Sequence, residues 1–113
     1  MSEDCLFCKV VAGEIPADIV HRGDTVLAFR DINPQAPTHV LVVPVAHHAD
    51  VATLAAADPA ALAELVAVGR QVATAEGHDD YRLVFNTGAG AGQSVFHMHG
   101  HVLAGRPLSW PPG

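Results

Sequence analysis

The sequence predicts an α+β fold, in which an antiparallel sheet of about five strands carries one long and one short helix. Three observations lead to this prediction. Short apolar or β-branched runs recur along the chain, brief turns join neighbouring runs, and one long segment has helical periodicity. The chain has 113 residues, half of them hydrophobic, which is enough for a real core but not for two domains. We therefore expect a single domain over residues 1–113.

Two segments have the signals of helices. The short one, over residues 4–13, is expected to begin with Asp4 as its N-cap and to end at Gly13. The long one begins at Asp58, followed by a proline at the first helical position, and ends at Gly77. Its apolar stripe is expected to cover the sheet, and it consists of Leu62, Leu65, Val66, Gly69, Val72 and Ala73.

Five apolar runs are expected to be strands. The first two form a hairpin around a turn at residues 22–24. The third is apolar at nearly every position, which is typical of a central strand covered on both faces. The expected strands span residues 18–21, 25–31, 38–44, 81–86 and 95–103.

The last of these runs contains His97, His99 and His101 at two-residue spacing, so the three imidazoles are expected to share one face. Packing alone rarely explains such a set, because each buried imidazole needs polar partners. One interpretation is a metal site. In the other, the middle histidine attacks phosphorus, provided that an acceptor holds the proton on its far ring nitrogen.

A glycine-rich loop at residues 87–94 leads directly into the histidines. Backbone N–H groups of Gly88, Gly90 and Gly92 can approach an anion closely, and Ser94 adds a hydroxyl. In isolation such a loop is more often a plain strand connector. Its position beside three imidazoles favours phosphoryl transfer, which depends mainly on positioning and charge stabilisation.

Two further features limit the classes of protein. Cys5 and Cys8 are too close to staple a fold, and in a reducing compartment such a pair indicates metal binding or redox chemistry. The scattered net charge of −6 argues against a general nucleic-acid binder. Because no apolar run approaches the ~18–20 residues of a membrane span and no signal pattern begins the chain, we expect a cytoplasmic protein with no membrane or nucleic-acid partner.

Together these motifs resemble the Hint branch of the histidine triad (HIT) family. The run HMHGHVL at residues 97–103 matches the family signature of three alternating histidines followed by hydrophobic residues. The segments PQAPTH at 34–39 and GQS at 92–94 make the match specific. Further similarity covers CLFCK at 5–9, EIPA at 14–17, LAFRDI at 27–32 and WPPG at 110–113.

The resemblance implies a hydrolase that cleaves the P–N or P–O bond at the α-phosphate of nucleoside 5′-phosphoramidates or acyl- and aminoacyl-adenylates. The reaction would pass through a nucleotidyl-histidine on His99, whose far N–H would be held by a carbonyl near His97. Alternatives are a dinucleoside polyphosphate hydrolase or nucleotidylyltransferase, a nucleotide-sensing scaffold dimer with incidental activity, and a metalloenzyme with zinc on all three triad histidines. No organic cofactor is implied.

The resemblance also implies roles for particular residues. His101 and backbone N–H groups near Gly92 would bind the phosphate, Ser94 would protonate the leaving group, and His39 would support the triad. Asp31 would accept hydrogen bonds from the ribose, and polar contacts would come from Asn86 and Gln93. A slot for a purine nucleotide would be formed by Leu6, Phe7, Val10, Phe29 and Ile32, for which ordinary core packing is the alternative.

Finally, the resemblance implies a structural zinc ion and a homodimer. The zinc ligands would be Cys5, Cys8, His47 and His97, with His48 as a substitute for His47. The two subunits would join their sheets into one. The tail at residues 105–113, including Trp110, would lie at the dimer interface, and a tail folded onto its own subunit is the alternative.

Overall fold

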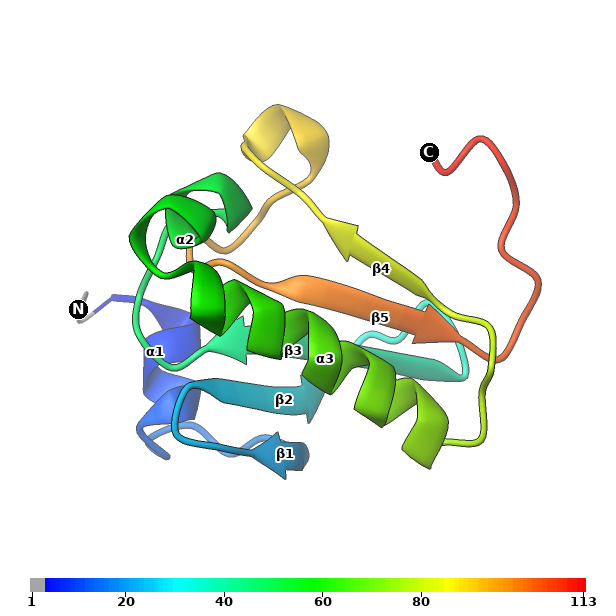
Figure 1. Cartoon of the computed structure of the whole chain (residues 1–113), viewed down its shortest axis with the longest axis horizontal. Helices are drawn as coiled ribbons and strands as arrows, with labels where there is room; N and C mark the ends of the chain where they lie inside the picture. Colours follow the sequence, from blue (N-terminus) through cyan, green and yellow to red (C-terminus); the bar gives the residue numbers. More distant parts are fainter. Residues whose placement is uncertain (1–3) are drawn as a thin grey trace.

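The computed structural model describes residues 4–113 and confirms the α+β fold. Its antiparallel sheet has the order β1-β2-β3-β5-β4, so β5, the strand that carries His101, lies between β3 and β4 (Figure 1). The strands are β1 (Ile19–Arg22), β2 (Val26–Arg30), β3 (Thr38–Pro44), β4 (Arg82–Phe85) and β5 (Gly100–Ala104). The helices are α1 (Leu6–Val11), α2 (Val51–Ala57), α3 (Pro59–Ala75) and the short 3-10 turn η1 (Ala89–Ala91).

Helix α3 begins as predicted, because the side chain of Asp58 accepts a hydrogen bond from the Ala61 N–H at 3.1 Å. Four of the six residues of the predicted stripe are buried, but its margin differs. Val66 is 42% exposed, and residues on the neighbouring row face the sheet instead. The buried residues of α3 are Ala61, Leu65, Val68, Gly69, Val72 and Ala73.

The two short helices differ from the prediction. In α1 the N-cap is Cys5 rather than Asp4, since the Cys5 Sγ accepts a hydrogen bond from the Cys8 N–H at 3.3 Å. Helix α2 was not predicted at all. Asp50 caps it through the Thr53 N–H and hydroxyl, both at 2.8 Å, but only Leu54 is buried in the helix, so its alanine-rich sequence has no apolar stripe.

The predicted strand over residues 95–103 is wrong in its first half, because regular pairing begins only at Gly100, opposite Val42. Before that point the Met98 N–H donates to the carbonyl of His48 at 2.6 Å, which holds the segment beside the turn after β3. The alternation of faces still holds. Met98 and Val102 are buried beneath α2 and α3, while the histidines lie on the opposite face.

The sheet is therefore covered on both faces, and β3 is buried at every residue, as expected for a central strand. Helices α2 and α3 cover one face and α1 covers part of the other (Figure 1). Gly100 is required where β5 meets β4, since an added Cβ would lie 2.7 Å from the Phe85 ring. Among residues 4–113, no helix has the length and apolar character needed to cross a lipid bilayer.

Candidate active site

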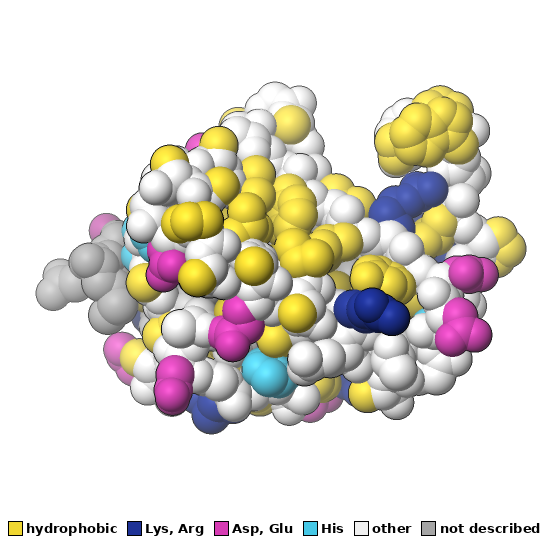
Figure 2. All heavy atoms as spheres, in the orientation of Figure 1, with side chains coloured by type: hydrophobic (Ala, Val, Ile, Leu, Met, Phe, Trp, Pro, Cys, Tyr) yellow, Lys and Arg dark blue, Asp and Glu magenta, His cyan; other side chains and the backbone are white. Residues whose placement is uncertain are grey.

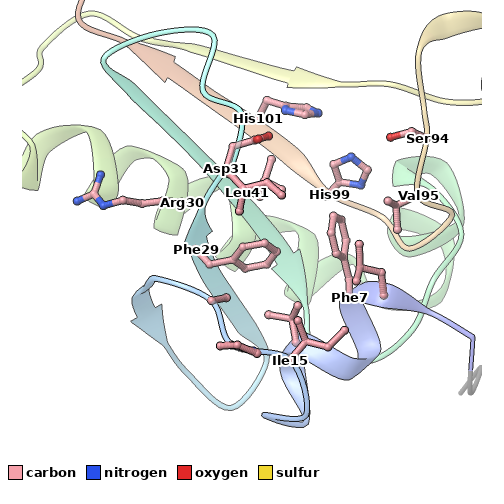
Figure 3. A pocket seen from close by; sticks show the side chains of 15 residues that line it. Phe7, Ile15, Phe29, Arg30, Asp31, Leu41, Ser94, Val95, His99 and His101 are labelled. Atoms are coloured by element: carbon pink, nitrogen blue, oxygen red, sulfur yellow. The ribbon is translucent and has the colours of Figure 1, made fainter.

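A pocket of about 350 Å³ opens on the face of the sheet that carries α1. Its walls are apolar, and the rings of Phe7 and Phe29 meet edge to face with centroids 5.4 Å apart. Figure 3 shows His99, His101, Asp31 and Ser94 gathered at one end of this apolar slot. The lining residues are Leu6, Phe7, Val10, Ile15, Pro16, Ala17, Phe29, Arg30, Asp31, Ile32, Leu41, Ser94, Val95, His99 and His101.

The imidazole of His99 is held in one tautomer. Its Nδ1 lies 2.8 Å from the backbone carbonyl of His97, which can only accept a hydrogen bond, so Nδ1 carries the proton. The Nε2 atom of the neutral ring is then left with a lone pair. The ring is 7% exposed and packs edge-on against Phe7 at a centroid distance of 5.0 Å. This arrangement orients an unprotonated nitrogen at the pocket.

His101 is held in the opposite tautomer by a relay of hydrogen bonds. The Gln35 N–H donates to His39 Nδ1 at 2.9 Å, so the proton of the neutral His39 ring lies on Nε2. That Nε2 is 2.9 Å from His101 Nδ1 and donates to it. Neutral His101 therefore carries its own proton on Nε2. The site thus combines a nitrogen lone pair on His99 with an N–H donor on His101.

Electrostatics keep this relay neutral. Burial lowers the pKa of His101 to about 4, with His99 and His39 acting in the same direction and the Asp31 carboxylate opposing them. Burial also lowers the pKa of His39, against the opposing effect of Asp31, whose Oδ2 lies 3.4 Å from His39 Nε2. Both rings are neutral near pH 7, so the tautomers set by hydrogen bonding persist.

Asp31, His39 and His101 bring three potential metal ligands within 4.8 Å of one another. The backbone N–H of Gln35 argues against a metal ion here. Because that N–H occupies His39 Nδ1, the neutral ring has its proton on Nε2 and offers no lone pair to a cation. We interpret this cluster as a hydrogen-bond relay.

A second cluster contains Cys5, Cys8, His47 and His97, brought together from three segments of the chain. His97 Nδ1 lies 3.3 Å from the Cys5 Sγ and 3.5 Å from the Cys8 Sγ, and His47 Nδ1 lies 3.4 Å from the Cys8 Sγ. Tetrahedral zinc, with bonds of about 2.3 Å to sulfur and about 2.0–2.1 Å to nitrogen, separates such ligands by about 3.5 Å. The spacing fits a metal ion.

The orientation of His97 supports the same interpretation. Its Nε2–H donates to the carbonyl of Pro44 at 2.8 Å, so the lone pair of the neutral ring is on Nδ1, the atom that faces both sulfurs. Both cysteine side chains are buried. The four residues therefore can hold a metal ion, while the backbone of His97 holds the His99 ring.

Three other residues of the predicted site lie at the rim of this pocket or outside it. Ile32 is fully exposed at the rim of the pocket. Asn86 does not line this pocket but a second one on the far side of His101. The buried Gln93 amide braces the glycine-rich loop, accepting from the Gly88 N–H and donating to the carbonyls of Ala49 and Val95.

Sequence reasoning missed part of the pocket wall, namely Ile15, Pro16, Ala17, Arg30, Leu41 and Val95. Of these, only Leu41 had a usable signal. It lies on β3 directly opposite His101 of β5, so it shares the histidine face of the sheet. Arg30 is the last residue of β2, and the others belong to irregular segments, for which the sequence pattern indicates no face.

Comparison with known proteins identifies the family. The HIT domain model matches residues 12–108, and the chain belongs to the HIT family. Relatives include the purine nucleoside phosphoramidase of Escherichia coli, 46% identical over 110 residues that cover 96% of this chain and 92% of that protein. Another is the 14 kDa zinc-binding protein of Zea mays, 46% identical over 112 residues that cover 96% and 87%.

Solved structures agree. A HIT family hydrolase from Legionella pneumophila superimposes with a TM-score of 0.93 at 48% identity, over 97% of this chain and 100% of that one. One from Clostridium thermocellum gives a TM-score of 0.92 at 38% identity, over 96% of each chain. These matches place the chain among the HIT family hydrolases.

Proposed function

We propose that this protein hydrolyses the P–N bond of purine nucleoside 5′-phosphoramidates, with His99 as the nucleophile. The observation that carries the proposal is the hydrogen bond from His99 Nδ1–H to the His97 carbonyl, which leaves Nε2 free at the pocket. A neutral imidazole nitrogen held in this way is a competent nucleophile toward phosphorus. The phosphoramidase activity named for the relative in Escherichia coli supports the same substrate class.

The pocket suits a nucleoside. A purine between Phe7, Phe29 and Leu41 would be bound by apolar contact, because this part of the wall offers few polar side chains. Asp31 lies at the polar end and would accept hydrogen bonds from ribose hydroxyls. The α-phosphate would then lie between His99 and His101, where the His101 Nε2–H can donate to a phosphate oxygen.

The chemistry takes two steps. In the first, the His99 Nε2 lone pair attacks the α-phosphorus, and the bond to the leaving nitrogen breaks as that nitrogen takes up a proton. Ser94, at the mouth of the pocket, is the proposed proton donor. The His97 carbonyl stabilises the positive charge that develops on the imidazole. In the second step water attacks phosphorus, the P–Nε2 bond breaks, and its electron pair returns to Nε2. Water loses a proton in this step, which balances the proton that the leaving nitrogen took up in the first.

Replacing the nucleophile tests this mechanism. We expect His99→Ala to lower kcat on adenosine 5′-phosphoramidate by at least about 10³-fold, while affinity for AMP, measured by calorimetry, changes only a few-fold. Mass spectrometry of wild-type protein quenched in alkaline denaturant should detect one added nucleotidyl group. His21→Ala, on β1 away from the pocket, is the matched control. Activity of His99→Ala within tenfold of wild type would show that His99 is not the nucleophile.

We further propose that Cys5, Cys8, His47 and His97 bind one structural Zn²⁺. Bound there, zinc would supply no reaction chemistry and would fix the N-terminal helix against the sheet. The zinc-binding relative in Zea mays supports the choice of metal.

Metal analysis tests the zinc site. Protein purified with zinc supplementation should contain about one zinc per chain, and both Cys8→Ser and His47→Ala should lose most of it because a closed site needs four ligands. His48→Ala should keep it, since His48 is outside the cluster and its bond to Met98 is made by its backbone carbonyl, which the substitution preserves. Zinc-free wild-type protein would contradict the proposal, and loss from His48→Ala alone would overturn the choice of His47.

We also propose a homodimer in which two sheets join along β4. This strand is at the edge of the sheet, and an exposed edge is prone to uncontrolled pairing with other chains. All four residues of β4 are half-buried. Figure 2 shows hydrophobic side chains gathered over α3 and toward β4. Leu62 and Phe85 are only partly buried against the core that α3 covers, and Val66 of α3 is exposed. Trp110, 82% exposed on the segment after β5, supports a tail that contributes to the same interface.

Charge at this surface tests the dimer. Wild-type protein should have twice the 11.8 kDa chain mass by sedimentation. Val66→Glu should raise the dimer dissociation constant at least about tenfold, because association would bury an unpaired carboxylate. Ala67→Glu adds the same charge at a neighbouring exposed position of α3 and should remain dimeric. A wild-type monomer at tens of micromolar, or equal effects of the two variants, would contradict the proposed interface.

A further inference from the structure

A short loop over residues 31–37 joins β2 to β3 and supplies two groups to the candidate active site. Asp31, its first residue, brings a carboxylate to the polar end of the pocket, and the Gln35 N–H begins the relay to His101. The Asn33 N–H donates to Asp31 Oδ1 at 2.8 Å, and the Gln35 side-chain amide donates to the Asn33 carbonyl at 3.0 Å. These last two bonds lie within the loop, so its position beside the pocket depends on how its ends are held.

Glu76, the residue after α3, contacts both ends of the loop. Arg30, the last residue of β2, donates to it through a paired contact, with Nη1 2.7 Å from Oε1 and Nη2 3.1 Å from Oε2. Thr38, the buried first residue of β3, has its hydroxyl 3.5 Å from the same Oε1. The Glu76 N–H donates to the Val72 carbonyl at 3.1 Å, which fixes its backbone at the helix end. We call Glu76, Arg30 and Thr38 the loop clamp.

The alternation of side chains along a strand explains how the clamp acts on the pocket. Arg30 pairs with Val40 and shares the face of Ala28, which is the face that α3 covers. The Asp31 N–H donates to the His39 carbonyl at 3.0 Å, so the ladder continues and Asp31 lies on the opposite face, with the histidines. Arg30 contributes to the pocket lining, but Figure 3 shows its guanidinium group extending away from the pocket and Asp31 directed into it.

Exposure and geometry favour a positional role for the clamp over a stabilising one. The Arg30 and Glu76 side chains are 39% and 29% exposed, and ion pairs in contact with water add little to the free energy of unfolding. A paired contact between arginine and a carboxylate nevertheless fixes the direction of both side chains. Asp18 Oδ2, 3.4 Å from the Arg30 Nε, holds the guanidinium group from another side. The Arg30 side chain therefore has a defined position even though its ion pairs are partly exposed.

We propose that Glu76 is a positioning residue for nucleoside binding, which acts through Arg30 to hold the Asp31 carboxylate where it accepts hydrogen bonds from the ribose. The inference rests on the proposed function, which assigns the ribose hydroxyls to Asp31. Gln35 has an anchor of its own, because its carbonyl accepts a hydrogen bond from Arg106 Nε at 2.9 Å. Loosening the clamp therefore weakens nucleoside binding but leaves the relay that begins at Gln35, and with it the chemical step, intact.

Two nucleotides that differ only in their ribose hydroxyls test this inference. Calorimetry compares AMP with 2′,3′-dideoxy-AMP, which offers no hydroxyl to Asp31. Wild-type protein should bind AMP at least about tenfold more tightly, because hydrogen bonds to a carboxylate are strong. In Glu76→Gln the dissociation constant for AMP should rise at least about fivefold, because the carboxylate of Asp31 is displaced. The dissociation constant for the dideoxy nucleotide should stay within about twofold of the wild-type value.

Further variants and measurements separate positioning from general damage. Glu64→Gln removes the same charge from an exposed position of α3 and should leave both dissociation constants unchanged. Glu76→Gln should keep kcat on adenosine 5′-phosphoramidate within about twofold of wild type, and its melting temperature should fall by less than about 5 °C. Arg30→Gln should weaken AMP binding to a similar degree, and the double variant should bind no more weakly than either single variant, because the two residues act as a pair.

The inference and the proposed function fail in different ways. Unchanged AMP affinity in Glu76→Gln, or an equal loss of affinity for AMP and the dideoxy nucleotide, would overturn the inference alone. Additive losses in the double variant, or a larger fall in melting temperature, would also overturn it, since the pair would then not act by holding Asp31. Equal binding of the two nucleotides by wild-type protein would contradict the ribose contact itself. Failure to turn over adenosine 5′-phosphoramidate would instead contradict the proposed function, while the AMP measurements would still decide the inference.

Discussion

The structure of the site depends on one hydrogen bond, from His99 Nδ1–H to the carbonyl of His97. Without it, either nitrogen of the His99 ring could carry the proton and the ring could rotate. The acceptor, the His97 carbonyl, lies in an anchored segment. His97 is fully buried and its ring donates to the Pro44 carbonyl. The N–H of the next residue, Met98, donates to the carbonyl of His48. The backbone that orients the His99 ring is therefore anchored to the turn after β3.

The cysteine and histidine cluster extends this anchoring to the N-terminus. Cys5 and Cys8 flank Phe7, whose ring packs on both His99 and Phe29. A metal ion held by the cluster would thus fix one wall of the apolar pocket and the segment that orients His99 at the same time. Such an ion would add stability to α1, which has only six residues and little stability of its own.

The sequence patterns predicted the fold class, the central strand and the start of the long helix, because these depend on local signals such as β-branched runs and an Asp-Pro cap. They failed where tertiary contacts decide. The segment before Gly100 alternates like a strand but is bonded to His48 instead of continuing the ladder. Helix α2 has a cap and alanines but a single buried side chain, so no periodicity could reveal it.

The candidate site was predictable to a similar extent. Spacing predicted that the three histidines share a face, and family resemblance indicated four metal ligands that the fold indeed brings together. The opposite tautomers of His99 and His101 were not predictable in full, because the relay to His101 begins at the backbone N–H of Gln35 on a loop. Gln93 likewise reads as a ligand-binding amide in the sequence but braces its own loop in the structure.

The division of labour between the two histidines is the central claim, and nitrogen NMR of histidine-labelled protein tests it directly. The neutral His99 ring should be observed as the Nδ1–H tautomer, because its Nδ1–H donates to the His97 carbonyl. His101 should be observed as the Nε2–H tautomer, remaining neutral until the pH approaches its lowered pKa of about 4. The Nε2–H tautomer in the neutral His99 ring, or the same tautomer in both rings, would contradict the account.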